Sequence, residues 1–91
     1  MRVVAQAGRD AEKKILSLQA ERIVHAELQR RRWQETDLAK RAKGDVGKVK
    51  IAGRLRAETV MTVKWIAERL QMGRAGYVNN RLYHWRNGTL P

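Results

Sequence analysis

Apolar residues between Thr62 and Asn87 recur with the period of an α-helix, in two runs that a glycine separates. The apolar positions of the first run are Val63, Ile66, Ala67 and Leu70, and those of the second are Ala75, Val78, Leu82 and Trp85. Such spacing places each set on one helix face, and Thr62 precedes the first run as a cap. Gly73, after Met72, can take the positive φ that ends a helix and redirects the chain. The pattern over 62–87 therefore predicts a helix-turn-helix.

Upstream, the pattern predicts three more helices. From Asp10 to about Arg32 nothing breaks a helix, and an apolar stripe recurs every four residues. This stripe is formed by Leu16, Ala20, Val24 and Leu28. A brief helix over 37–43 stops at Gly44, and Asp45 caps a further helix from Val46 to about Glu58. We expect an all-α fold: a small bundle of about five helices with a long first helix, forming a single nucleic-acid-binding domain over 10–91 after a loose lead-in over 1–9.

Gly53 lies inside the helix predicted over 46–58. A glycine costs about 1 kcal/mol relative to alanine in a helix interior. We attribute its presence to close packing against a neighbouring helix. The three tryptophans, Trp33, Trp65 and Trp85, fit helix packing better than the stacking of bases.

Charge narrows the class of partner. The 91 residues suit one small domain, and 20 Lys and Arg against nine Asp and Glu give a net charge of +11. The excess is greatest over 46–91, where nine basic side chains accompany two acidic ones. The positive electrostatic field of such a chain favours the binding of a polyanion such as a nucleic acid. With no cysteine, the chain has no disulfide, thiol or cysteine-zinc chemistry.

We expect no cofactor and no metal site. No apolar run is long enough for a signal peptide or a membrane span, so a cytoplasmic, nucleoid-associated protein without a membrane partner is expected.

The second helix of the pair presents an outer face without an acidic residue. The candidates for contact with bases are Arg74, Tyr77, Asn80, Arg81 and His84. Arginine, asparagine and histidine can hydrogen-bond base edges in the major groove, and asparagine pairs with adenine in two hydrogen bonds. A helix that faces only water more usually mixes Glu with Lys. His84 can alternatively be a solvated surface residue, and His25 fits packing or the surface better than ligand binding.

Phosphate contacts would come from basic and polar residues around this pair of helices. The candidates are Thr62, Lys64, Arg69, Asn79, Arg86, Lys48 and Arg54. Lys64 is the first choice, because it lies close to a helix start, where phosphate is attracted. For the lysines and arginines of the third and fourth helices, the alternative is a charge that only keeps the protein soluble.

From about Glu21 to Trp85 the chain resembles the C-terminal helical region of bacterial REP-associated, IS200-like tyrosine transposases. The matching segments are AERIVHAEL (20–28), Trp33 with the acidic segment that ends at Leu38, KGD (43–45), KVKIAGRLR (48–56), ETVMTVKWIAERLQMG (58–73) and YVNNRLY (77–83). In that family the region is thought to be an accessory DNA-binding part. The resemblance therefore implies nucleic-acid binding in transposition, or in a domesticated descendant.

The chain departs from that family in two places. Arg81 stands where the family would prefer an apolar residue, which implies altered contacts. Family members cut DNA with a tyrosine nucleophile and a metal held by two histidines separated by one residue. His25 and His84 lie far apart in this chain, and nothing supplies a base or metal beside Tyr77 or Tyr83. We expect no catalysis.

These observations favour a sequence-reading helix-turn-helix protein that binds double-stranded DNA. Two alternatives stay open. The same charge serves structured RNA, so an RNA-binding or ribonucleoprotein module is the first. The second is a protein-interaction module, in which the stripe of the first helix pairs with a second copy or with a separate transposase body.

Overall fold

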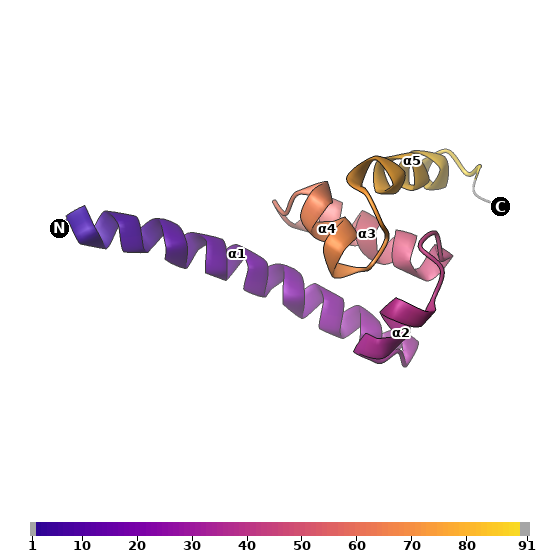
Figure 1. Cartoon of the computed structure of the whole chain (residues 1–91), viewed down its shortest axis with the longest axis horizontal. Helices are drawn as coiled ribbons and strands as arrows, with labels where there is room; N and C mark the ends of the chain where they lie inside the picture. Colours follow the sequence, from indigo (N-terminus) through magenta and orange to yellow (C-terminus); the bar gives the residue numbers. More distant parts are fainter. Residues whose placement is uncertain (1, 90–91) are drawn as a thin grey trace.

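The computed structural model describes the backbone of residues 2–89 and the side chains of residues 12–89. The backbone forms five helices and, over the described residues, no strand. These helices are α1 (Arg2–Arg31), α2 (Glu35–Lys40), α3 (Val46–Glu58), α4 (Val63–Arg69) and α5 (Ala75–Arg86) (Figure 1). The predicted all-α fold with a long first helix is confirmed. No helix in the described part of the chain is long and apolar enough to cross a membrane.

The first helix begins earlier than the pattern indicated. Its backbone is helical from Arg2, so the lead-in predicted over 1–9 is wrong from residue 2 onward, and Met1 lies outside the described residues. No proline interrupts this segment, and Gly8 lowers helix stability by only about 1 kcal/mol. The helix ends at Arg31, and Arg32 then takes a φ of 59°.

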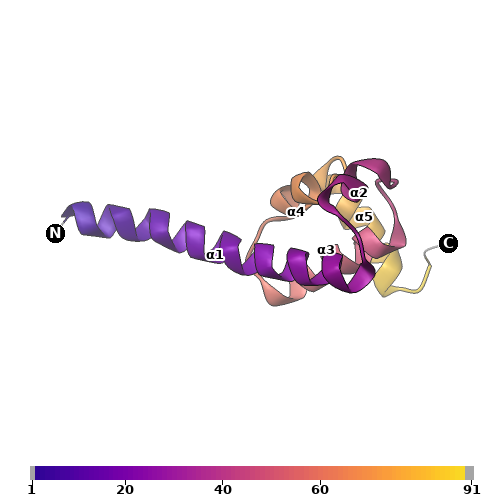
Figure 2. The same ribbon diagram turned by 90° about the horizontal axis from the view of Figure 1, so that it is seen from below.

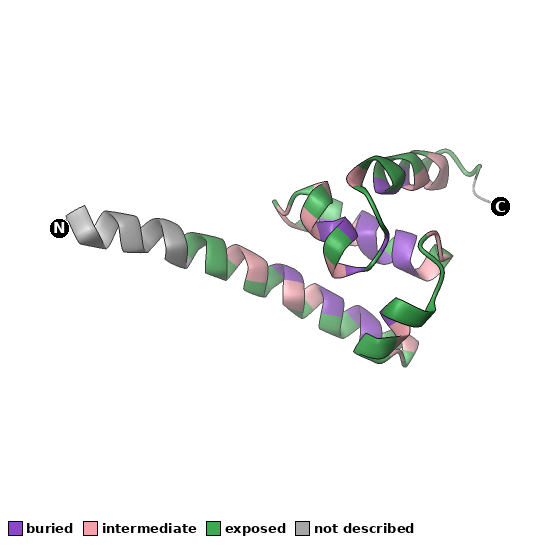
Figure 3. Cartoon of the chain, in the orientation of Figure 1, coloured by how far each residue is buried: buried purple, intermediate pink, exposed green. Residues whose placement is uncertain are grey.

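The half of α1 nearest its C-terminus is the part that packs on the other helices. Figure 2 shows this half of α1 beside α3, and Figure 3 colours it by burial. Ala20, Val24 and Leu28 are buried there, whereas Ile15 and Leu18 are exposed. Most of the apolar stripe predicted for this helix is therefore covered by the chain itself.

The second helix begins and ends before the predicted bounds of 37–43. The backbone N–H of Gln34 donates to Oδ2 of Asp37 over 2.6 Å, which starts the helix at Glu35. Arg41 takes an extended conformation, with φ −81° and ψ 151°, so the helix stops before it reaches Gly44. A local side-chain contact thus decides these bounds.

The caps predicted for α3 and α4 are both present. Oδ1 of Asp45 accepts from the N–H groups of Gly47 and Lys48, at 2.8 and 3.3 Å. Oγ1 of Thr62 accepts from the N–H of Trp65 at 3.0 Å. After α4, Gln71 and Gly73 take positive φ values of 55° and 82°, which turn the chain into α5. The two helices of the predicted pair are confirmed in position.

The hydrophobic core is built around α3, which packs against α1, α4 and α5. The buried apolar residues of this core are Ala20, Val24, Leu28, Leu38, Val49, Ile51, Ala52, Leu55, Ile66, Ala67, Leu70, Met72, Val78 and Leu82. Trp33, Trp65 and Trp85 pack partly buried against this core, which confirms their predicted packing roles. A Cβ on Gly53 would collide with the ring of Trp85, so the predicted close approach at this glycine is confirmed.

Candidate nucleic-acid interface

The side of α5 that faces away from the core carries most of the residues predicted to contact bases. Val78 and Leu82 are buried beneath the helix. Tyr77, Asn80 and His84 recur at spacings of three and four, and Arg81 follows Asn80, so these residues lie along one side of α5. Asn80 is exposed, Tyr77 is 40% exposed, and Arg81 and His84 are half-buried. Arg74 is the exposed N-cap residue of the helix.

Tyr77 and Arg81 contact each other and the loop between α2 and α3. The hydroxyl of Tyr77 lies against Gly44, where an added Cβ would collide with it. The guanidinium carbon of Arg81 lies 5.9 Å from the centre of the Tyr77 ring. Nε of Arg81 is buried without a hydrogen-bond partner among the described residues. The start of α5 and this loop therefore form one continuous surface.

His84 is held from the end of the helix. Its Nδ1 lies 2.7 Å from Oγ1 of Thr89, and its ring meets that of Tyr83 edge-on, with 5.4 Å between the ring centres. Nδ2 of Asn87 donates to the carbonyl of Tyr83 over 2.8 Å. These contacts restrain the imidazole on the surface of α5.

Three carboxylates that bind arginines lie at the contacts of α1 with the other helices. No Asp or Glu lies in α5. Glu21 and Glu35 bind Arg69, whereas Glu27 binds Arg30, Arg31 and Arg54. These three carboxylates therefore neutralise cations where α1 packs, and α5 has no acidic residue of its own.

Lys48 is not a phosphate contact, so that prediction is wrong. Its side chain is 0% exposed. Nζ donates to the carbonyl oxygens of Leu38 at 2.6 Å, Arg41 at 3.1 Å and Gln71 at 3.1 Å. Burial lowers the pKa of Lys48, against the opposing effect of Asp45. Its spacing of four and seven residues from the inward-facing Ala52 and Leu55 was the signal for burial.

Arg69 is also removed from the set of phosphate contacts. Its side chain is only 18% exposed. Nε and an Nη donate to Glu21 at 2.6 and 3.0 Å, and both Nη atoms donate to Glu35 at 2.9 and 2.8 Å. The hydrogen bonds that Arg69 donates to these two carboxylates raise the pKa of Arg69, and Arg69 in turn lowers the pKa of Glu35. Arg69 ties α1 and α2 to α4.

Arg54 forms similar pairs on α3, and its phosphate role stays a prediction, because its side chain is 39% exposed. It donates to Glu27 and Glu58, each at 2.9 Å, and these hydrogen bonds raise the pKa of Arg54. Burial disfavours the charge on Glu27, but hydrogen bonds from Arg54 and Arg30 outweigh this and lower the pKa of Glu27. The fold pairs Arg54 with Glu27, which lies 27 residues away, and the sequence pattern did not indicate this pair.

The other predicted phosphate contacts remain on the surface. Lys64 is exposed near the start of α4, and Asn79 and Arg86 are exposed on α5. Thr62 is exposed as well, although its hydroxyl already caps α4. Asn79 and Arg86 therefore lie on the same helix as Asn80, and Thr62 and Lys64 lie at the start of the preceding helix.

Lys43 belongs to this surface and was missed by the sequence analysis. It lies in the α2–α3 loop, and a Cβ built on Gly73 would lie 3.3 Å from its Cδ. The two residues line a hollow of about 520 Å³. The full lining is Lys43, Met72, Gly73, Arg74, Gly76 and Tyr77. No spacing along the chain relates Lys43 to the start of α5, so only the fold could find it.

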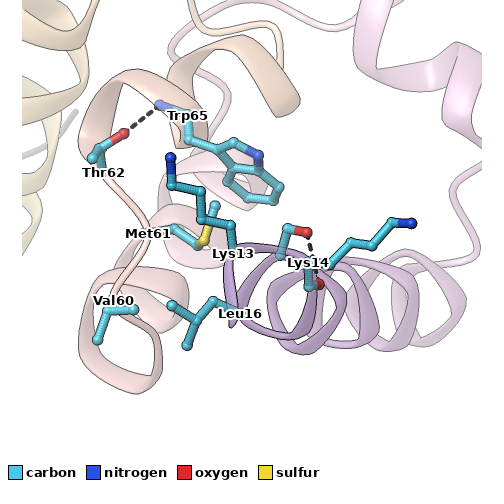
Figure 4. A pocket seen from close by; sticks show the side chains of 8 residues that line it. Lys13, Lys14, Leu16, Val60, Met61, Thr62 and Trp65 are labelled. Carbon is cyan, nitrogen blue, oxygen red and sulfur yellow. Dashed lines mark hydrogen bonds between the residues drawn. The ribbon is translucent and has the colours of Figure 1, made fainter. Parts of the chain in front are cut away.

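A second hollow of about 520 Å³ lies between α1 and the segment that leads into α4 (Figure 4). Its lining is Lys13, Lys14, Leu16, Ser17, Val60, Met61, Thr62 and Trp65. Leu16, Met61 and Trp65 make this hollow largely apolar. It differs in chemistry from the basic hollow beside α5.

No group of three or more His, Cys, Asp or Glu side chains that could hold a metal ion occurs in the part of the chain that the structure describes. His25 is exposed, as expected, and its Nε2 lies 3.5 Å from Glu21 and 3.7 Å from Glu35. Comparison of the chain with family models, with curated proteins and with solved structures finds no match.

Proposed function

We propose that this protein binds double-stranded DNA in a sequence-dependent manner, with α5 as the recognition helix of a helix-turn-helix. One observation carries the proposal: α5 buries Val78 and Leu82 and turns an acid-free face centred on Asn80 toward solvent. Such a face has little to contribute to folding. It does have the donors and acceptors that base edges require.

The dimensions of α5 agree with this role. Its 12 residues span about 18 Å at 1.5 Å per residue, and the major groove is about 12 Å wide. Tyr77 and His84 are separated by about 10 Å along the helix axis, which corresponds to about three base-pair steps of 3.4 Å. We therefore propose a site of three to four base pairs for α5, with Asn80 at its centre as the reader of an adenine.

Residues on either side of this face would bind the DNA backbone. Lys64, Asn79 and Arg86 are exposed around α5, and Lys and Arg that neutralise phosphates release counterions. This supplies affinity that does not depend on sequence, whereas Asn80 and its neighbours supply preference. The resemblance to transposase accessory regions supports an auxiliary role in transposition on the nucleoid, without catalysis by this chain.

The proposal is tested by selecting duplexes from a random-sequence library over a salt series and repeating the selection with two variants. Asn80→Ala is expected to relax the preference at one base pair, at a cost of about 1–3 kcal/mol for the preferred site. Lys64→Ala is expected to weaken all duplexes about equally and to reduce the salt slope by about one. Equal effects of both variants on every duplex would contradict the assignment.

A competition between hairpin RNA and duplex DNA tests the first alternative. A preference for hairpin RNA over duplex DNA at one salt concentration would favour the RNA-binding function. The protein-interaction function rested on the stripe of α1, and three of its four residues, Ala20, Val24 and Leu28, are already buried within the chain. The structure thus leaves less apolar surface for a partner helix than the sequence pattern indicated.

A further inference from the structure

The hollow beside α5 is lined by basic side chains from two distant segments. Lys43 comes from the α2–α3 loop, and Arg74 and Tyr77 come from the start of α5. The Lys43 side chain lies across Gly73, at the turn that leads into the helix. The fold has therefore placed a cation of the preceding loop next to the first turn of α5.

The two cations of this hollow have no ion-pair partner among the described residues, although Glu68 lines a neighbouring hollow together with Arg74. Lys43 and Arg74 form no ion pair with a carboxylate of the described residues, whereas Arg41, Arg54 and Arg69 each do. Neighbouring like charges repel one another unless an anion lies between them. A concave surface with two such cations is suited to an anion from outside.

Gly76, which also lines the hollow, indicates how closely that anion can approach. A Cβ added at Gly76 would meet nothing within 4 Å. The two glycines of α3 differ from Gly76. A Cβ on Gly47 would collide with Trp33, and a Cβ on Gly53 would collide with Trp85. Glycine makes a helix less stable than alanine does. Because an alanine would also fit at this position, the packing of the protein does not require glycine there. A ligand that comes close to the helix backbone does require a residue without a side chain.

We propose that this hollow receives one phosphate of the DNA backbone, held between Lys43 and Arg74 and admitted by the bare backbone at Gly76. The inference rests on the proposed function and adds to it the ligand class of the hollow and a contact from the α2–α3 loop. Arg74 then binds a phosphate rather than a base. Bound in this way, the phosphate fixes how far the start of α5 enters the groove.

The test uses the full chain and a duplex recovered by the selection described above, with binding followed by fluorescence anisotropy over a salt series. Lys43→Gln is expected to reduce affinity about eightfold near 0.1 M salt and to lower the salt slope by about 0.9, the value for one phosphate contact. The loss is expected to be the same for preferred and unrelated duplexes. Lys40→Gln, which removes the same charge from an exposed position of α2, is the matched control and is expected to change affinity less than twofold.

Gly76→Ala examines the close approach independently of charge. Its affinity is expected to fall at least as far as that of Lys43→Gln, while its melting temperature stays equal to or above that of the unmodified chain, because alanine favours the helix. Thermal melting followed by circular dichroism verifies that the variant is folded.

The outcomes separate this inference from the proposed function. If Lys43→Gln binds like Lys40→Gln, or if Gly76→Ala binds like the unmodified chain, the phosphate site is refuted while sequence-dependent binding stands. If the unmodified chain binds duplexes without preference, the proposed sequence-dependent function is refuted, and the comparison of Lys43→Gln with Lys40→Gln on any duplex still decides the phosphate site. If the unmodified chain binds no duplex, both are refuted.

Discussion

Replacing Lys48 by methionine would remove the ammonium group that joins three segments of the backbone. Methionine keeps most of the side-chain volume, so the main loss is of the hydrogen bonds to the carbonyls of Leu38, Arg41 and Gln71. The bond to Leu38 is fully buried, and a buried acceptor left unpaired costs about 1–3 kcal/mol. The other two bonds are part-buried, and water can replace them at about 0.5–1 kcal/mol each.

Relief of the buried charge offsets part of this loss. We therefore expect Lys48→Met to lower the free energy of unfolding by about 3 kcal/mol, a large share of the 5–15 kcal/mol typical of a domain. For a chain of this length the melting temperature would fall by roughly 12–24 °C.

Urea unfolding followed by tryptophan fluorescence measures this change directly, with thermal melting by circular dichroism as a second probe. Lys50→Met is the matched control, because Lys50 is exposed on the same helix, and it is expected to alter stability by less than about 0.5 kcal/mol. A loss below 1 kcal/mol for Lys48→Met, or equal losses for both variants, would refute the reasoning. Under conditions where it is folded, Lys48→Met should also retain the salt slope of DNA binding, since Lys48 is fully buried.

Two further predictions concern packing and charge. Gly53→Ala is expected to destabilise the protein by about 1–3 kcal/mol, because the new methyl group would overlap the Trp85 ring, and thermal melting that shows equal or higher stability would contradict this packing. Stability is also expected to fall as the pH is lowered from about 5, because Glu27 and Glu35 have pKa values below the ordinary 4.5 and the unfolded chain takes up protons first. Glu27→Gln should flatten this acid limb in urea titrations at pH 5 and pH 3, and an unchanged limb would show that the Glu27 pairing contributes nothing.

Most of the secondary structure could be predicted from local rules. Asp45 and Thr62 cap their helices through contacts with residues two or three positions away, so the starts of α3 and α4 were visible in the sequence. The inward faces followed in the same way, because a period of 3.6 places Val78 and Leu82 on one side and Asn80 on the other. The predicted start of α1 was wrong, because no capping residue or apolar period in the sequence marks the beginning of a helix at Arg2.

The sequence by itself thus determined an all-α chain, its helix pair over 62–87 and the acid-free face of α5, because each depends on neighbours within one or two helix turns. The tertiary structure alone decided which cations are available to a ligand. The charge of Lys48 can be buried because carbonyl oxygens 10, 7 and 23 residues away accept hydrogen bonds from its ammonium group. Arg69 is occupied by a carboxylate 48 residues away, and Lys43 reaches the start of α5 across the α4–α5 turn. The helix period can place a basic side chain on an inward face, as it does for Lys48, but only packing in three dimensions decides which carbonyl or carboxylate binds its charge.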